Sequence, residues 1–205
     1  MGTTRTAGFI LCAAALATVV AMALHPSSAH AVGLGAVVHA SMILLLALMG
    51  WGFLQFARAR GVWSGWVSAG LVAYAVGVFG HIVAGTINGF VVPAMAGPAA
   101  PVSHDIFRFA WHANQAFAKL GMIAGSAAYL LWSIDLLRKG PGRLLGSAGA
   151  VIGISVPLLL FSGVVRLDVH GALLLYGLQA LWAAMVGTAM ARGQIQPSGN
   201  AATSS

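Results

Sequence analysis

Long apolar segments, separated by short polar connections, recur along almost the whole of this 205-residue chain. A soluble domain cannot bury apolar surface on that scale, because 60% of the residues are hydrophobic and only 6% carry a charge. A helix of about 20 apolar residues crosses the hydrocarbon core of a bilayer and satisfies its own backbone hydrogen bonds. The sequence therefore predicts an all-α, polytopic transmembrane bundle in direct contact with lipid.

Six helices account for the apolar segments. We expect them at residues 7–24, 32–57, 63–92, 107–137, 144–165 and 169–191. No stretch is left over for an independent globular domain, so residues 1–192 are predicted to form a single transmembrane helical domain. The small polar residues from Gly193 to Ser205 predict a disordered cytoplasmic tail.

The basic residues predict the orientation of the bundle. With six spans and both termini in the cytoplasm, the basic residues of the N-terminus, of two connections and of the C-terminal end all face the cytoplasm, as the positive-inside rule requires: Arg5, Arg58, Arg60, Arg138, Lys139, Arg143 and Arg192. The expected location is the cell (inner) membrane. Since these cations lie singly or in pairs between apolar runs, the net charge of +7 does not indicate nucleic-acid binding.

The first apolar segment has a second interpretation. Arg5, an apolar run and the triplet Ala29-His30-Ala31 resemble a secretory signal with its cleavage site. The run is longer than the apolar region of about 7–15 residues that is usual in such signals, which favours a retained helix. Cleavage of residues 1–31 would leave five spans in the same orientation.

Polar residues of four different helices are expected at one depth, near the non-cytoplasmic boundary. Counted from the cytoplasmic cations at about 1.5 Å per residue, His39, His81, Lys119 and His170 each lie about 30 Å away. His112 lies further out on its helix, and His25, His30 and His104 are assigned to outer loops. This level of the bundle is the candidate site.

The helix at 107–137 carries the clearest polar pattern. Asp105, Arg108, His112, Gln115 and Lys119 follow one another at steps of three and four, which places them on one helix face. Because lipid penalises such a stripe, we expect it to face the bundle interior or an outer vestibule. The segment is longer than one membrane thickness, so it tilts or rises above the bilayer.

A haem b protein that transfers electrons is the first functional hypothesis. Haem needs axial imidazoles in a dry slot between helices, and His39, His81, His112 and His170 are the available ligands. Lys119 and Arg108 are candidates for pairing with the propionates, and Gln115 lies on the same stripe. No attachment motif for a covalent haem is present.

A small transporter or binding protein is the alternative, with an outward vestibule for a metal ion or an anionic solute. The same four histidines would then be metal ligands, and copper or zinc suits imidazole, with methionines assisting Cu(I). A third hypothesis is a structural or assembly subunit without a ligand. Glycine and alanine recur at helical spacing, for example at Gly77, Gly121, Gly125 and Gly149, which suits close helix packing, a homodimer or a membrane-protein partner.

Familiar enzyme signatures are missing from the sequence. With one cysteine and three acidic residues, two-carboxylate catalysis is nearly excluded, and redox chemistry on a bound cofactor is the one activity that we entertain. The tryptophans Trp51, Trp63, Trp66, Trp111 and Trp132 are predicted to anchor the helices at the membrane interfaces.

Overall fold

The computed structural model describes residues 2–25, 32–95, 102–138 and 142–195. All regular structure in these residues is helical, and six of the helices are long and apolar enough to cross a membrane. The elements are α1 (Gly2–Ala23), α2 (Val32–Arg60), α3 (Gly65–Thr86), η1 (Ile87–Val91), α4 (Val92–Met95), α5 (His104–Arg138), α6 (Arg143–Phe161) and α7 (Val169–Ala191). The chain is thus a multi-pass membrane protein, as predicted, and α3, η1 and α4 together form one span.

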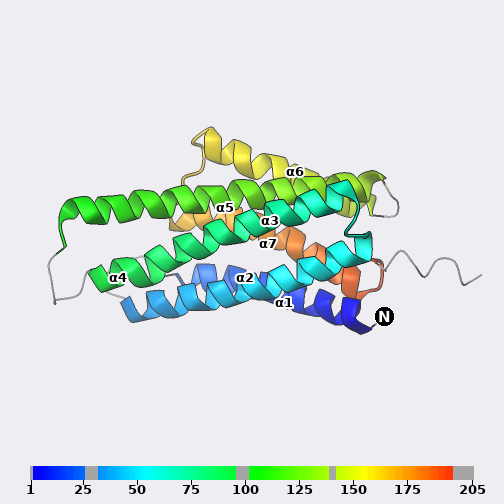
Figure 1. The fold of residues 1–205 in the computed structure, drawn as a ribbon, viewed down its shortest axis with the longest axis horizontal. Helices are drawn as coiled ribbons and strands as arrows, with labels where there is room; N and C mark the ends of the chain where they lie inside the picture. Colours follow the sequence, from blue (N-terminus) through cyan, green and yellow to red (C-terminus); the bar gives the residue numbers. More distant parts are fainter. Residues whose placement is uncertain (1, 26–31, 96–101, 139–141, 196–205) are drawn as a thin grey trace, which may run out of the picture.

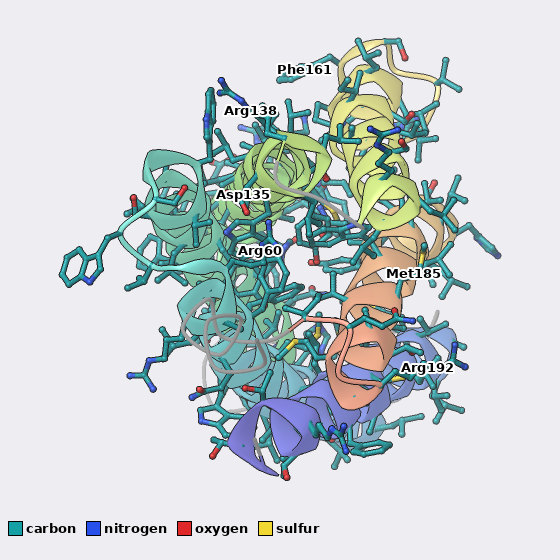
Figure 2. All side chains as sticks on the ribbon, turned by 90° about the vertical axis from the view of Figure 1, so that its right-hand side faces the viewer. Arg60, Asp135, Arg138, Phe161, Met185 and Arg192 are labelled. Carbon is teal, nitrogen blue, oxygen red and sulfur yellow. The ribbon has the colours of Figure 1, made fainter. Side chains whose placement is uncertain are left out.

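The six spans form a closed ring. Helix α1 packs between α2 and α7, α3 packs between α2 and α5, and α6 packs between α5 and α7. The ring is visible in the end-on view of Figure 2, and Figure 1 shows the helices lying side by side along the long axis of the molecule. We call the end that contains Arg60 and Arg138 the basic end, and the end that contains His25 and His104 the histidine end.

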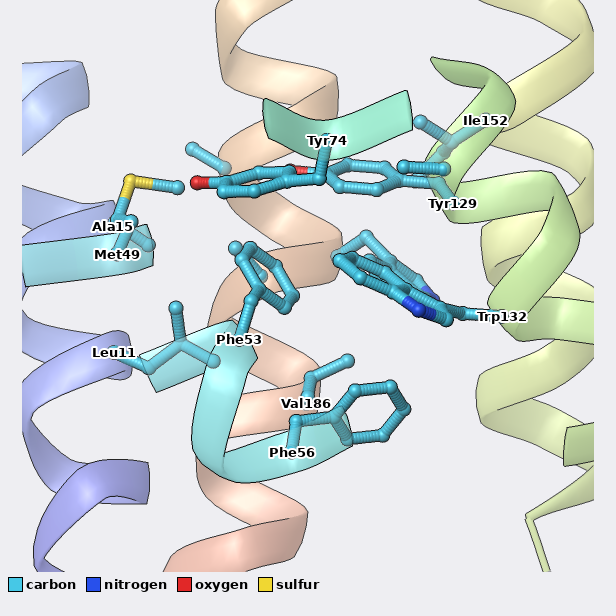
Figure 3. Close-up of a cluster of buried hydrophobic side chains, with 14 of the residues drawn as sticks. Leu11, Ala15, Met49, Phe53, Phe56, Tyr74, Tyr129, Trp132, Ile152 and Val186 are labelled. Carbon is cyan, nitrogen blue, oxygen red and sulfur yellow. The ribbon is translucent and has the colours of Figure 1, made fainter. Parts of the chain in front are cut away.

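Aromatic side chains fill the middle of the ring (Figure 3). They come from α2, α3, α5 and α7 and are Phe53, Phe56, Tyr74, Tyr129, Trp132 and Trp182. The rings of Trp132 and Trp182 stack with an angle of 12° between their planes, and Tyr129 lies 4.4 Å from Trp182 between ring centroids. Such ring packing stabilises the fold in addition to the stabilisation that comes from burying large side chains. The prediction that Trp132 anchors the interface is therefore wrong, because its side chain is fully buried and donates to the Val67 carbonyl.

Glycines allow the closest helix contacts inside the chain. A Cβ atom on Gly77 would lie 2.9 Å from the Gly125 nitrogen, and one on Gly80 would lie 2.7 Å from the Gly121 nitrogen. Helices α3 and α5 can approach this closely only because both carry glycine there. Several of the small residues that suggested a partner helix are thus used between helices of one chain, and a homodimer or other partner stays a prediction.

An ion pair joins α2 and α5 at the basic end (Figure 2). The Arg60 guanidinium donates from Nε to Asp135 Oδ2 at 2.9 Å, and Ser64 Oγ donates to Oδ1 of the same carboxylate at 3.4 Å. Asp135 is 1% exposed. The Arg138 guanidinium, three residues further along α5, lies over the Trp66 ring.

The third span changes its helical pitch before Pro93. Proline has no N–H, and its ring collides with the carbonyl group four residues earlier, here that of Gly89. The segment therefore forms the π-helical turn η1 and then continues as α4. A π-turn inside an α-helix inserts an extra residue and changes the direction of nearby side chains. In this chain it affects Asn88, which lies in the candidate site.

The first turns of α5 extend beyond the histidine ends of α6 and α7 (Figure 1). The prediction that the segment tilts or rises above the bilayer stays a prediction. At the other end of the chain, Ile195 is buried against the core. Residues 196–205 of the predicted disordered tail, and the Ala29-His30-Ala31 triplet, lie outside the described residues.

Candidate functional site

A cavity of about 500 Å³ lies inside the ring at the histidine end. All spans except α6 contribute to its wall, together with η1 and the turn before α7. Trp111 and Asp168 line the cavity and are themselves exposed, so the cavity reaches the molecular surface at this end. The aromatic core occupies the interior between the cavity and the Arg60–Asp135 pair.

Three polar groups meet at His39 on one wall. The His39 Nδ1 atom lies 2.7 Å from the Gly35 carbonyl oxygen, one turn earlier in α2, and donates to it. That bond leaves Nε2 of a neutral ring as the acceptor. His25 Nε2 and Asn88 Nδ2 each lie 3.3 Å from His39 Nε2. The end of α1, helix α2 and the π-turn η1 thus converge on one imidazole nitrogen.

His81 forms a second polar group with Tyr176. The Tyr176 hydroxyl lies 2.7 Å from His81 Nδ1, which joins α3 to α7, and both residues line the cavity. The imidazole is buried, with 8% of the residue exposed.

Each buried histidine lies against a glycine of a neighbouring helix. A Cβ atom on Gly89 would overlap the His39 side chain, and one on Gly121 would overlap the His81 ring. Helix packing in membranes uses such small residues to admit a bulky group from the facing helix. Gly89 and Gly121 therefore fix where the two imidazoles can lie.

Two amide side chains of α5 complete the polar lining. Asn114 Nδ2 donates to the Ala84 carbonyl at 2.8 Å, and Gln115 Nε2 donates to the Leu167 carbonyl at 3.2 Å. Both amides bond to backbone where a helix or turn leaves a carbonyl accessible. They tie α5 to α3 and to the turn before α7, and so hold the cavity wall together.

Cationic side chains do not take part in the described lining of the cavity. It contains three histidines, two asparagines, one glutamine, one tyrosine and Asp168, and neither lysine nor arginine is among its described residues. Cavities that hold anions usually supply ammonium or guanidinium groups. This lining suits a cation or a neutral polar ligand better than an anion.

Three of the predicted site residues, His39, His81 and Gln115, line the cavity. The other predicted ligands do not reach the cavity. His112 and His170 are exposed at the histidine end, Lys119 is exposed on α5, and Arg108 pairs with Asp105 at 3.0 Å on the surface. Of the stripe on α5, only Gln115 lines the cavity, because the face of α5 that lines it carries Trp111, Asn114, Gln115 and Ala118, and His112 and Lys119 are rotated away from that face.

Four polar residues of the described lining, His25, Asn88, Asn114 and Tyr176, were not among the predicted site residues. His25 was assigned to an outer loop, but its ring reaches His39 on the neighbouring helix α2, because α1 ends just before His25. Tyr176 had no signal in the sequence that separates it from a packing residue. Asn88 shared a helix face with His81 in the sequence pattern, and the π-turn sets its final direction.

Comparison of the chain with models of known protein families, with curated proteins and with solved structures finds no match. The interpretation of the cavity therefore rests on its own chemistry.

Proposed function

We propose that this chain binds a transition-metal ion in the cavity at its histidine end, as a small transporter or as a membrane binding protein. The observation that carries the proposal is the convergence of His25 and His39 on one point of a cavity whose described lining holds neither lysine nor arginine. Imidazole nitrogen is a good ligand for zinc, copper, iron and nickel. Among the hypotheses drawn from the sequence, a metal ion suits these groups best, and an anionic solute suits them least.

The aromatic core bears on the mode of action. It fills the ring between the cavity and the basic end, so an ion in the cavity has access to one end of the bundle only. For a transporter, this arrangement corresponds to a state open toward the histidine end. For a binding protein, it is the working state.

Haem b is the second candidate. It is favoured by one observation, that His39 and His81 reach the same cavity from different helices. Against it, the cations predicted for the propionates, Lys119 and Arg108, lie outside the lining. A Soret band in the spectrum of the purified protein would support haem, whereas a colourless protein would remove it.

The test of metal binding is the thermal unfolding of the purified protein with single salts. We expect at least one of ZnCl₂, CoCl₂ and anaerobic Cu(I) to raise the midpoint temperature, because an ion that binds only the folded state stabilises it. Sodium sulfate tests whether an anion stabilises the protein instead. Stabilisation by sulfate alone would contradict the proposal, and so would the lack of any response to the three metals.

Two glycine variants test whether the metal-dependent stabilisation arises in the cavity. A Cβ atom on Gly85 would meet Ile43 and His39 only at ordinary contact distances of 3.8–3.9 Å, so Gly85→Leu fills the cavity without a backbone collision. Gly177 has nothing within 4 Å of a Cβ atom, so Gly177→Leu adds the same side chain elsewhere. We expect Gly85→Leu to abolish the metal-dependent shift and Gly177→Leu to retain it.

A further inference from the structure

The two helices that meet at His25 and His39 carry the same pair of residue types in opposite order. Met22 precedes His25 by three positions, and Met42 follows His39 by three. Residues three apart lie on one face of a helix, and the hydrogen bond from the His25 nitrogen to the Met22 carbonyl, 3.1 Å, continues the helical turn at the end of α1. All four side chains line the cavity.

The two imidazoles are arranged as a pair of ligands would be. Two nitrogens that bind one ion at about 2.0–2.1 Å with a tetrahedral angle are about 3.3–3.4 Å apart. The Nε2 atoms of His25 and His39 lie 3.3 Å apart, with an angle of 77° between the ring planes. The Nδ1 bond of His39 to the Gly35 carbonyl is the contact that typically orients a metal-binding histidine.

The ligands other than the two imidazoles indicate which metal ion suits the site. Among the described residues, no group of three or more His, Cys, Asp or Glu side chains is placed to hold an ion. Zinc sites usually have three or four such ligands, so the described part of this site is incomplete for zinc. Thioether sulfur is a soft ligand that favours Cu(I). Met22 and Met42 supply two such sulfurs in the lining of the same cavity.

We infer that His25 and His39, together with the thioethers of Met22 and Met42, form a Cu(I) site on the α1–α2 wall of the cavity. This inference rests on the proposed function and names its ion and its ligands. The ion is held between two helices at the mouth of the bundle, with the rest of the cavity free for water or for a molecule that exchanges copper.

Anaerobic titration of the purified full-length protein with Cu(I), in competition with a chromophoric chelator such as bicinchoninate, tests the site. We expect one Cu(I) per chain and an affinity about 10-fold weaker or more in His25→Ala and in His39→Gln. His112→Ala and His170→Ala are the matched controls, because both histidines are exposed outside the cavity lining, and their affinity should equal that of the unaltered protein.

X-ray absorption at the copper edge tests the thioethers independently of affinity. We expect nitrogen and sulfur neighbours in the unaltered protein, and loss of the sulfur signal in the double variant Met22→Leu with Met42→Leu, which keeps the volume of both side chains. A copper spectrum without sulfur overturns the four-residue site. Retention of full affinity in both His25→Ala and His39→Gln would show that the 3.3 Å contact is a hydrogen bond only.

Different results would overturn the Cu(I) site and metal binding in the cavity. Stabilisation by zinc or cobalt without Cu(I) binding overturns the copper site and leaves metal binding in the cavity intact. A protein that responds to none of the three ions overturns both. The variants are checked for folding by size-exclusion chromatography and by their midpoint temperature without metal.

Discussion

Arg60 Nε donates to Asp135 Oδ2 over 2.9 Å, and this contact ties the ends of α2 and α5 together beneath the aromatic core. The carboxylate is almost completely buried, while the guanidinium retains 17% exposure. A charge in such a place is stable only while its partner remains. The pair therefore links α2 to α5, the two helices on either side of α3, at the end opposite the cavity.

Asp135→Asn should destabilise the fold strongly. It leaves the Arg60 guanidinium partly buried without a carboxylate, which costs about 3 kcal/mol of unfolding free energy, the lower end of the range for buried pairs because Arg60 is partly exposed. Denaturant unfolding in detergent measures the change. The control is Asp105→Asn, which breaks the exposed pair with Arg108 and should cost about 1 kcal/mol or less. Equal effects of the two variants would contradict the structural role of the Arg60–Asp135 pair.

Tyr176→Phe and Tyr74→Phe should differ although each removes one buried hydroxyl. The Tyr176 hydroxyl bonds to His81 Nδ1, so its loss should cost about 1 kcal/mol, with cavity water replacing part of the bond. The Tyr74 hydroxyl has no hydrogen-bond partner among the described residues, so its removal should be neutral or stabilising. The midpoint temperatures of thermal unfolding measure both effects. A larger loss of stability in Tyr74→Phe than in Tyr176→Phe would contradict the hydrogen bond between Tyr176 and His81.

Gly121→Ala should force His81 out of its position. The added Cβ atom would overlap the imidazole, and overpacking of this kind costs about 1–3 kcal/mol. Gly177→Ala is the matched control in a helix interior, where open space leaves only the gain in helix propensity, about 1 kcal/mol relative to glycine. Thermal unfolding should therefore move in opposite directions for the two variants. A neutral Gly121→Ala would show that α3 and α5 separate easily at this point.

The orientation of the bundle is tested by thiol labelling in a Cys12→Ser background. Single cysteines are introduced in place of Asp105, at the histidine end, and of Arg143, at the basic end, and both positions are exposed. The positive-inside rule predicts that a membrane-impermeant maleimide labels position 105 in intact spheroplasts and position 143 only after permeabilisation. The reverse pattern would place the cavity on the cytoplasmic side.

Much of the architecture could be predicted because its cause is local. Apolar length and the need to satisfy every backbone hydrogen bond in lipid lead to helices, and the cations between them divide the chain into six spans. Counting residues from those cations also placed His39 and His81 at one end of the bundle. Both inferences need only the rise of a helix, which does not depend on the fold.

The composition of the site depended on rotation and contact between helices. Helical spacing placed His112 and Gln115 on one face of α5, yet only Gln115 reaches the cavity, because the rotation of α5 turns the face with Trp111, Asn114 and Gln115 inward and leaves His112 exposed. Trp132 and Trp66 were both predicted to be interface anchors. Trp132 instead lies in the centre of the ring, whereas Trp66 lies near its edge.

By itself, the sequence determined that the chain holds six helices long and apolar enough to span a membrane, with basic residues at one end and histidines at the other, because hydropathy and charge act along the chain. The tertiary structure alone decided that His25 meets His39, that Tyr176 meets His81 and that Asp135 pairs with Arg60. Each of these contacts joins residues of different helices, and their meeting depends on how the ring closes and where glycine lets two helices touch.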